Sequence, residues 1–156
     1  MKKVVVTQRV DYHESVNEFR NALDQNLVSW LYEVGCHVIP VPNVRNSDEL
    51  TSASHPIVAW LDEISPECIV LSGGKSRRMR QEKGLVKYKG KALIEYAIET
   101  LKPLCNELVI STANDAYSYL DLPMIADEIS DCGPIGGITT CMKAIEADIY
   151  LVISCD

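Results

Sequence analysis

Hydrophobic positions in this chain fall into short continuous runs, separated by longer segments in which they recur every three or four residues. The continuous runs predict six strands, at Lys3–Thr7, Val38–Val41, Cys68–Leu71, Leu108–Ser111, Met124–Ala126 and Tyr150–Cys155. The helical spacing predicts four helices, at Ser15–Val34, His55–Ile64, Leu93–Leu101 and Gly136–Ala147. Gly35 and Pro103 are expected to end the first and third of these helices, and the polar segment Asn43–Ser54 is expected to be a loop.

Strands that alternate with helices predict an α/β fold. Because the strands are apolar almost throughout, both faces of the sheet should be covered by helices. We therefore expect a three-layer sandwich with a mainly parallel, Rossmann-like sheet of about six strands. The chain has 156 residues and no internal repeat or obvious linker, so a single domain spanning 1–156 is expected.

Composition narrows the possible functions. The formal net charge of -7 argues against a general nucleic-acid or anionic-membrane binder. No apolar run approaches the length of a membrane span, and the start has too short an apolar run for a secretory signal. The six cysteines include no CxxC pair and most lie in apolar segments, which favours reduced core thiols in a cytoplasmic protein over disulfides or zinc.

A local cluster of cations follows the third strand, in the segment LSGGKSRRMRQEKG. Ligands of parallel sheets bind beyond the carboxyl ends of strands, where Ser72, Gly73 and Gly74 follow Leu71. Glycines let the backbone amides approach a ligand closely, and cations at Lys75, Arg77, Arg78 and Lys83 suit a polyphosphate. The segment is neither a Walker loop nor GxGxxG. The alternative interpretation is a tight turn followed by a solvated basic loop.

Carboxylates are expected at the same edge of the sheet. The last strand delivers Asp156, which could hold Mg²⁺ through oxygen ligands shared with phosphates, or could simply be a solvated end. Asp127 follows the fifth strand. In DCGPIGG, Gly133 and Pro134 predict a turn, and Gly136 with Gly137 would open a helix whose amino end favours anions or close packing. A plain turn and helix start is the alternative there.

Several motifs in order identify a resemblance from Cys68 to Asp156. The segments LSGGKSRRMRQEKG, GKALIEYAIETL, ADEISDCGPIGG and LVISCD resemble the molybdenum cofactor guanylyltransferases, which are Rossmann-like nucleotidyltransferases. The resemblance implies transfer of GMP from GTP to molybdopterin, with Mg²⁺ and release of pyrophosphate. It implies nucleotide binding by Leu71, Ser72, Gly73, Gly74, Arg78, Lys83, Asp127 and Asp156, with Asp156 as the metal ligand.

The chain departs from that family pattern in four places. Arg80 stands where the family has glycine, and Glu82 replaces aspartate. The segment ISTAND differs from the usual spacing after the fourth strand, so no guanine or ribose contact is carried over to it. Family members also continue beyond Asp156 with residues for the molybdopterin half of the site, so an incomplete domain is expected.

The first part of the chain resembles a different family. Lys3 to about Gly74 is similar to the amino end of class I glutamine amidotransferase-like proteins, whose third strand also ends in LSGG. The GxCxG elbow and its His and Glu partners are not found in this sequence, and Cys36 is better interpreted as a core thiol. We expect segments 1–66 and 67–156 to form a fusion or chimera joined at a shared strand.

This junction has a topological consequence, because both halves place a strand beside the third one. Right-handed crossovers favour a single sheet in the order second, first, sixth, third, fourth, fifth. Alternatives leave the last strand out, put it at an edge or exchange it in a homodimer. The leading functional hypothesis is a GTP- and Mg²⁺-binding nucleotidyltransferase-like domain. Its rivals are a non-catalytic chimeric scaffold and an amidotransferase-like protein without its triad.

Overall fold

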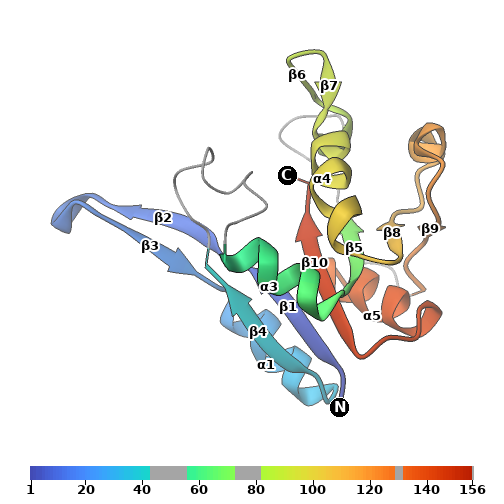
Figure 1. Ribbon diagram of the computed structural model, residues 1–156. Coiled ribbons are helices and arrows are strands. Elements are labelled where there is room, and N and C mark those ends of the chain that lie inside the picture. The colour runs from blue at the N-terminus through green and yellow to red at the C-terminus, as the bar shows by residue number, and fades with distance from the viewer. Residues whose placement is uncertain (43–55, 73–81, 129–131, 156) are drawn as a thin grey trace.

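The computed structural model describes residues 1–42, 56–72, 82–128 and 132–155, and the structural statements below refer to these ranges. The predicted loop Asn43–Ser54 lies outside them. Within them, the backbone is dominated by one large sheet with helices packed on it (Figure 1).

Six parallel strands form this sheet, in the order β4-β1-β10-β5-β8-β9. Their bounds are Lys3–Thr7 (β1), His37–Val41 (β4), Glu67–Leu71 (β5), Leu108–Ser111 (β8), Met124–Ile125 (β9) and Ile149–Ser154 (β10). The last strand is inserted between the first and third predicted strands, with Val4 paired to Tyr150 and Leu151 paired to Cys68. The predicted strand order is therefore confirmed, and strand bounds differ from the prediction by one residue at most.

Helices cover both faces of the sheet, which confirms the three-layer α/β prediction. Helices α1 (Gln25–Glu33) and α5 (Pro134–Ala144) pack on one face, whereas α3 (Pro56–Ile64) and α4 (Leu93–Leu101) pack on the other (Figure 1). Alternation along β1 shows the division, since Val4 and Val6 join the α1/α5 core and Val5 joins the α3/α4 core. All three valines are buried, as expected for an interior strand.

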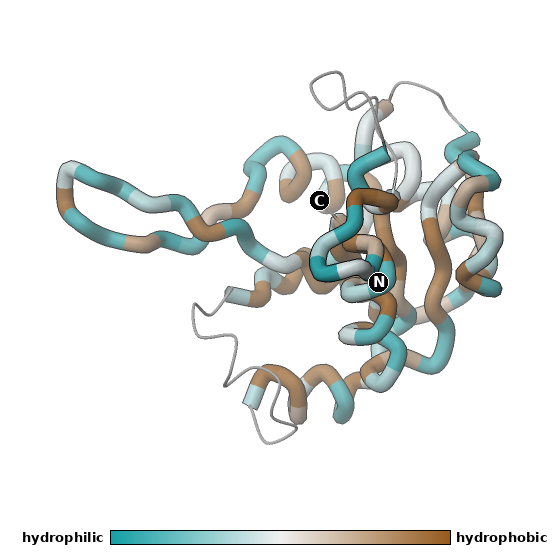
Figure 2. Tube along the Cα trace, turned by 90° about the horizontal axis from the view of Figure 1, so that it is seen from above, coloured by the Kyte–Doolittle hydropathy of each residue, from teal (hydrophilic) through white to brown (hydrophobic). Residues whose placement is uncertain are grey.

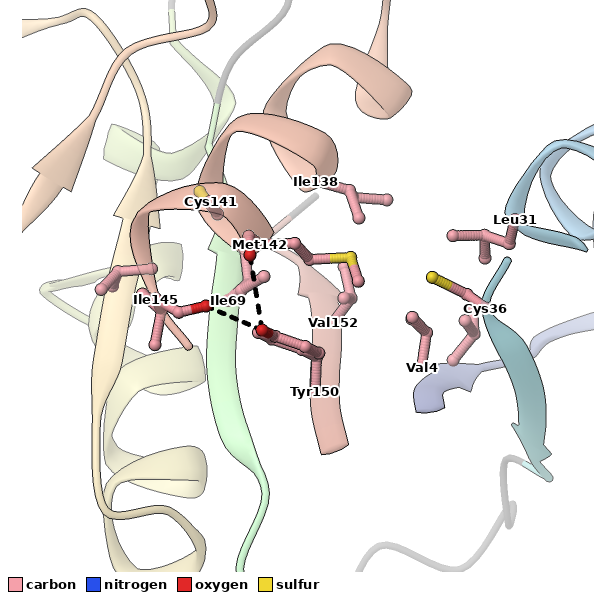
Figure 3. Close-up of a cluster of buried hydrophobic side chains, with 12 residues drawn as sticks. Val4, Leu31, Cys36, Ile69, Ile138, Cys141, Met142, Ile145, Tyr150 and Val152 are labelled. Atoms are coloured by element: carbon pink, nitrogen blue, oxygen red, sulfur yellow. Dashed lines mark hydrogen bonds between the residues drawn. The ribbon is translucent and has the colours of Figure 1, made fainter. Parts of the chain in front are cut away.

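The hydroxyl of Tyr150 is a polar group buried at the α1/α5 core, and it makes several hydrogen bonds there. Tyr150 is completely buried on β10, and its hydroxyl donates to the carbonyl oxygens of Ile145 at 2.7 Å and Met142 at 3.4 Å (Figure 3). The same oxygen accepts from the amide of Ala147 at 2.9 Å and from Lys2 Nζ at 3.0 Å. This network ties the end of α5 to the amino edge of the sheet, far along the strands from their carboxyl ends.

The predicted helix Ser15–Val34 is wrong in its first half. This half instead contains β3 (Glu18–Ala22). That strand pairs with the preceding β2 (Arg9–His13) in a two-stranded antiparallel hairpin, which is joined through the 3₁₀ turn η1 (Glu14–Val16). The hairpin projects from the body of the molecule as an arm of mixed hydropathy (Figures 1 and 2). Phe19, which was expected on the apolar face of a helix, is 45% exposed on this arm.

Cross-strand contacts explain why a hairpin forms there. The rings of Tyr12 and Phe19 lie 4.7 Å apart on one face, and Asn17 adopts a left-handed conformation with φ 52° in the turn. The opposite face carries two ion pairs between neighbouring positions of one strand, Arg9–Asp11 and Arg20–Glu18. The polar/apolar alternation of RVDYH and the ring contact across the strands thus prevail over the helical spacing of later leucines.

Helix α1 begins only after the arm, at a capping residue that the sequence analysis did not recognise. Asp24 accepts hydrogen bonds from the amides of Asn26 and Leu27, which satisfies donors of the first turn. Gly35 ends the helix as predicted: its φ is 82°, its amide donates to Tyr32 O, and the amide of Cys36 donates to Leu31 O. This pair of bonds is a Schellman motif.

Helices α4 and α5, a small hairpin and three 3₁₀ helices complete the described elements. Helix α4 has the predicted bounds, and α5 begins at Pro134, two residues earlier than predicted, because proline is well suited to a first helical turn. A small hairpin, β6 (Lys87–Tyr88) and β7 (Lys91–Ala92), was not predicted. Three further 3₁₀ helices are η2 (Lys83–Leu85), η3 (Lys102–Leu104) and η4 (Asp115–Leu120). In the described ranges, no helix combines the length and apolar character needed to cross a membrane.

Candidate functional site

The carboxyl edge of the sheet gathers the described residues that the sequence analysis singled out. Leu71 is the last residue of β5, and Ser72 follows it with its amide bonded to Ser111 O on β8 at 3.1 Å. Ser72 is 2% exposed, and its hydroxyl oxygen has no hydrogen-bond partner among the residues that the structure describes. A buried hydroxyl at a strand end is thus available to this edge.

Gly84 packs against the carboxyl edge of the sheet, close to Ser72 and Cys155. A Cβ atom at this position would lie 2.7 Å from Tyr117 Oη, 2.8 Å from Ser72 Oγ and 2.9 Å from Cys155 Sγ. These three groups come from separate parts of the chain and converge on one point. No side chain fits there without displacing one of them, which explains glycine at the end of the EKG motif.

Tyr117 closes the cluster from η4. The residue is completely buried, and its hydroxyl donates to Glu82 Oε2 at 3.3 Å. Burial raises the pKa of Tyr117 to about 12; the nearby Ser72 hydroxyl opposes this rise and the Glu82 carboxylate adds to it. The phenol therefore remains a proton donor at ordinary pH.

Lys83 lies between two anchored neighbours. Glu82 is held by Tyr117 and Gly84 by its packing, while Lys83 itself is exposed. The turn is closed by hydrogen bonds from Leu85 N to Glu82 O at 3.2 Å and from Val86 N to Lys83 O at 3.0 Å. The backbone of Lys83 is thereby fixed beside the end of β5.

Asp127 lies at the same edge, beyond β9. Its Oδ1 accepts a hydrogen bond from Ser111 Oγ at 3.3 Å. A Cβ atom on Gly137 would collide with the Ser111 hydroxyl and lie 3.1 Å from Asp127 Oδ1, so α5 sits close against this pair. The amide of Glu128 donates to Thr140 Oγ1 at 3.1 Å, which ties the segment after Asp127 to the same helix.

The end of β10 joins the edge next to β5. The amide of Cys155 donates to Leu71 O at 3.4 Å, and its thiol is buried in the cluster around Gly84. The structure therefore brings Leu71, Ser72, Lys83 and Asp127 to one edge. The other predicted site residues, Gly73, Gly74, Arg78 and Asp156, lie outside the described residues, as does Arg80.

Magnesium is the metal that the sequence analysis expects here. The described ranges contain no group of three or more His, Cys, Asp or Glu side chains arranged to hold a metal. Magnesium bound together with phosphates needs only one or two protein carboxylates, and Asp127 is an exposed carboxylate at the carboxyl edge. Asp127 is therefore one oxygen donor of the type that Mg²⁺ accepts, whereas Asp156, the residue expected to hold the metal, lies outside the described residues.

Four residues of the site were not predicted as a group: Gly84, Glu82, Ser111 and Tyr117. Glu82 and Tyr117 are 35 positions apart, so their hydrogen bond follows from the fold and not from local spacing. A partial signal exists in ISTAND, since Asn114 is a typical helix cap and its Oδ1 accepts from Ala116 N at 3.0 Å. That cap starts the helix that carries Tyr117.

A cavity lies at the root of the arm formed by β2 and β3. This cavity of about 510 Å³ is lined by residues of the arm, α1 and β4, including Asn21, Leu23, Val28, Tyr32 and Pro40. Among the described residues, its lining contains no lysine, arginine, aspartate or glutamate. Binding the phosphates of a nucleoside triphosphate needs cations or ordered amides. We therefore place the candidate nucleotide site at the carboxyl edge instead.

Four of the six cysteines are core residues, whereas Cys105 is partly buried and Cys132 is exposed. Cys36, Cys68, Cys141 and Cys155 are buried, which confirms their expected place in the core. Burial raises the pKa of the Cys36 thiol, with Lys2 opposing the shift, and burial raises the pKa of Cys141 to about 11. Cys36 is accordingly a poor nucleophile.

Comparison with known proteins identifies the family of the segment that contains this edge. The model of the MobA-like NTP transferase domain matches residues 68–156, more than half of the chain. The chain belongs to this family. The matched region begins in β5 and contains every residue of the carboxyl-edge site described above.

Curated relatives carry a more specific name. A probable molybdenum cofactor guanylyltransferase of Flavobacterium johnsoniae is 41% identical over 87 residues, which cover 56% of this chain and 46% of the relative. The molybdenum cofactor guanylyltransferase of Shewanella woodyi is 38% identical over 94 residues, covering 58% and 48% respectively. A probable enzyme of that name from Carboxydothermus hydrogenoformans is 33% identical, covering 56% and 44%. The chain spans about half the length of the curated relatives it matches.

Proposed function

We propose that this protein binds GTP at the carboxyl edge of its sheet, as a nucleotidyltransferase domain of the type that transfers GMP from GTP to molybdopterin. The observation that carries the proposal is the convergence of Ser72, Lys83 and Asp127 at one edge, within the segment that matches the family. Relatives named as molybdenum cofactor guanylyltransferases support the choice of nucleotide and acceptor.

Each residue has a definite task in this proposal. Backbone amides and the hydroxyl at the end of β5, from Leu71 through Ser72, Gly73 and Gly74, bind the nucleotide. Lys83, together with Arg78, neutralises charge that develops on the phosphates when the bond between the α- and β-phosphates breaks. Asp127, oriented by Ser111, contacts the nucleotide as a hydrogen-bond acceptor.

Magnesium completes the charge balance in this proposal. When bound, it supplies Lewis-acid neutralisation of the phosphate oxygens, and Asp156 is the residue that would hold it. The chain's own contribution is positional: the cluster around Gly84 fixes Lys83, and α5 fixes the pair of Ser111 and Asp127. An oxygen atom of the acceptor bonds to the α-phosphorus of GTP as the bond between the α- and β-phosphates breaks, so pyrophosphate leaves and the guanylyl group passes to the acceptor.

The acceptor, assembly and setting are also part of the proposal. The chain spans about half the length of its relatives, and we propose that the part matched here supplies the nucleotide half of the site. We also propose a homodimer and a cytoplasmic location; cysteines that form no disulfide among the described residues suit a reducing compartment.

The segment before the family match has its own proposal. We propose that residues 1–66 derive from a class I glutamine amidotransferase-like protein and that the chain is a fusion or chimera forming one domain. The continuous sheet supports the single domain, since β1 pairs with β10 and β10 pairs with β5. The rival interpretation is a non-catalytic scaffold, and the short coverage of the relatives favours keeping it as the second candidate.

Titration calorimetry with GTP and Mg²⁺ tests the proposed function. The wild-type chain is expected to bind with saturable heat, and Lys83→Ala is expected to weaken binding by about tenfold or more, as for loss of a charge-assisted phosphate contact. Lys87→Ala is the matched control, because Lys87 is an exposed lysine four positions away on β6. Absence of heat with the wild-type chain would favour the scaffold.

A further inference from the structure

Tyr117 holds a position that neither the family pattern nor the sequence analysis assigns. Its helix η4 starts at Asn114, whose side chain caps Ala116 N and whose carbonyl accepts from Tyr117 N at 3.2 Å. The ring is completely buried in the α3/α4 core together with Ile110 and Leu151. Cap and core therefore fix the ring, so the hydroxyl has a defined place at the carboxyl edge.

That hydroxyl meets the segment around Lys83 on both sides. It donates to Glu82 Oε2 at 3.3 Å, and it lies where a Cβ of Gly84 would be 2.7 Å away. The residue between these two contacts is Lys83. One phenol hydroxyl thus determines where the residues before and after the lysine can lie.

We propose that Tyr117 is a positioning residue for Lys83: its hydrogen bond to Glu82 and its contact with Gly84 hold the lysine backbone at the end of β5, ready for phosphate. This inference rests on the proposed nucleotide site. It also accounts for Glu82, which is longer than the aspartate of the family pattern and reaches the phenol.

Two features support a role for the hydroxyl beyond packing. Its partner is a half-buried carboxylate, and bonds to charged acceptors are stronger than neutral ones. The phenol is protonated at ordinary pH, as any tyrosine is, and burial raises its pKa further, to about 12. The donor is therefore present throughout the range in which nucleotide transfer would operate.

The test is Tyr117→Phe, which removes one oxygen and keeps the ring. Amide hydrogen exchange of Leu85 and Val86, measured without nucleotide, should become about fivefold faster, because both amides close the turn that holds Lys83. The Kd for GTP with Mg²⁺ should rise by about fivefold, the equivalent of one hydrogen bond. Tyr150→Phe is the matched control: it removes a buried hydroxyl at the opposite edge and should leave both readouts unchanged.

A double-mutant cycle separates positioning from general destabilisation. In a Glu82→Leu background, Tyr117→Phe should cost less GTP affinity than in the wild type, because the hydrogen bond to Glu82 is already gone and only the contact with Gly84 is left to lose. An equal loss in both backgrounds would overturn the proposal, as would unchanged exchange at Leu85 and Val86. If the wild-type chain binds no GTP, the proposed function fails and the positioning role for phosphate fails with it. The exchange data then still show whether Tyr117 holds the turn.

Discussion

Ser111 Oγ lies 3.3 Å from Asp127 Oδ1, so a side-chain hydrogen bond joins the carboxyl ends of β8 and β9, in addition to the backbone bond from Thr112 N to Ile125 O. Helix α5 lies against this pair at Gly137, where a Cβ atom would reach the Ser111 hydroxyl. The sheet edge is thus preorganised on its β9 side by small residues. Its β5 side is preorganised in the same way, by Gly84 against Ser72 and Tyr117.

Gly84→Ala should destabilise the protein by about 1–3 kcal/mol, because the added methyl meets three atoms at less than 3.0 Å. Denaturant unfolding measures the loss. In the Gly84→Ala, Tyr117→Phe double variant, part of this loss should be recovered, since one of the three atoms is removed. Simple additivity of the two losses would contradict the packing described here.

Ser111→Ala should weaken GTP binding by a few-fold, because it frees the Asp127 carboxylate from its orienting donor. Asp127→Ala should weaken binding at least as much, and the two effects should not add. Thr139→Ala is a suitable control, since Thr139 Oγ1 bonds only within α5, to Ile135 O, among the contacts that the structure gives. Calorimetry with the wild type, the two single variants at Ser111 and Asp127 and their double variant measures this. Full additivity of the two losses would show that Ser111 acts independently of Asp127.

How much of this could be predicted from the sequence depends on the range of the contacts. The strand order was predictable, because β1, β5 and β10 are continuous apolar runs and right-handed crossovers leave few arrangements. The arm was missed, because Phe19 and Leu23 happen to continue the helical spacing of α1. The bond between Tyr117 and Glu82 could not be predicted, because nothing local in either segment indicates its distant partner.

The sheet should unfold as one unit across the proposed junction. Both tryptophans, Trp30 and Trp60, precede residue 67, whereas Ile110 is completely buried on β8 in the same core as Val5. Ile110→Ala should therefore lower the unfolding midpoint reported by tryptophan fluorescence, with a loss of about 2–4 kcal/mol. A tryptophan transition that does not move would mean that the two segments unfold separately.

The arm should contribute little to stability, because its apolar side chains are partly exposed. Phe19→Ala removes a ring contact with Tyr12 and should cost less than about 1 kcal/mol. Leu31→Ala, in the completely buried position on α1, should cost about 2–4 kcal/mol. Thermal unfolding of the two variants compares them directly, and similar losses would mean that the arm is packed more tightly than the structure shows.

Stability should fall at high pH through Tyr117. Its pKa rises from about 10 in the unfolded chain to about 12 in the folded protein, so the folded state retains a proton that the unfolded state loses. The corresponding stabilisation is complete below about pH 10 and disappears as the pH rises to about 12. Cys141 acts in the same direction in both chains, so the difference between wild type and Tyr117→Phe isolates the tyrosine. Parallel pH profiles would contradict the assigned shift.

The central claim, that a guanine nucleotide binds at the carboxyl edge of the sheet, is tested most directly by backbone amide chemical shifts during titration with GTP and Mg²⁺. The account predicts saturable shifts at Ser72, Lys83 and Asp127, with none at Val28 and Tyr32 in the cavity at the root of the arm. Shifts confined to that cavity, or no saturable shift at the carboxyl edge, would contradict it.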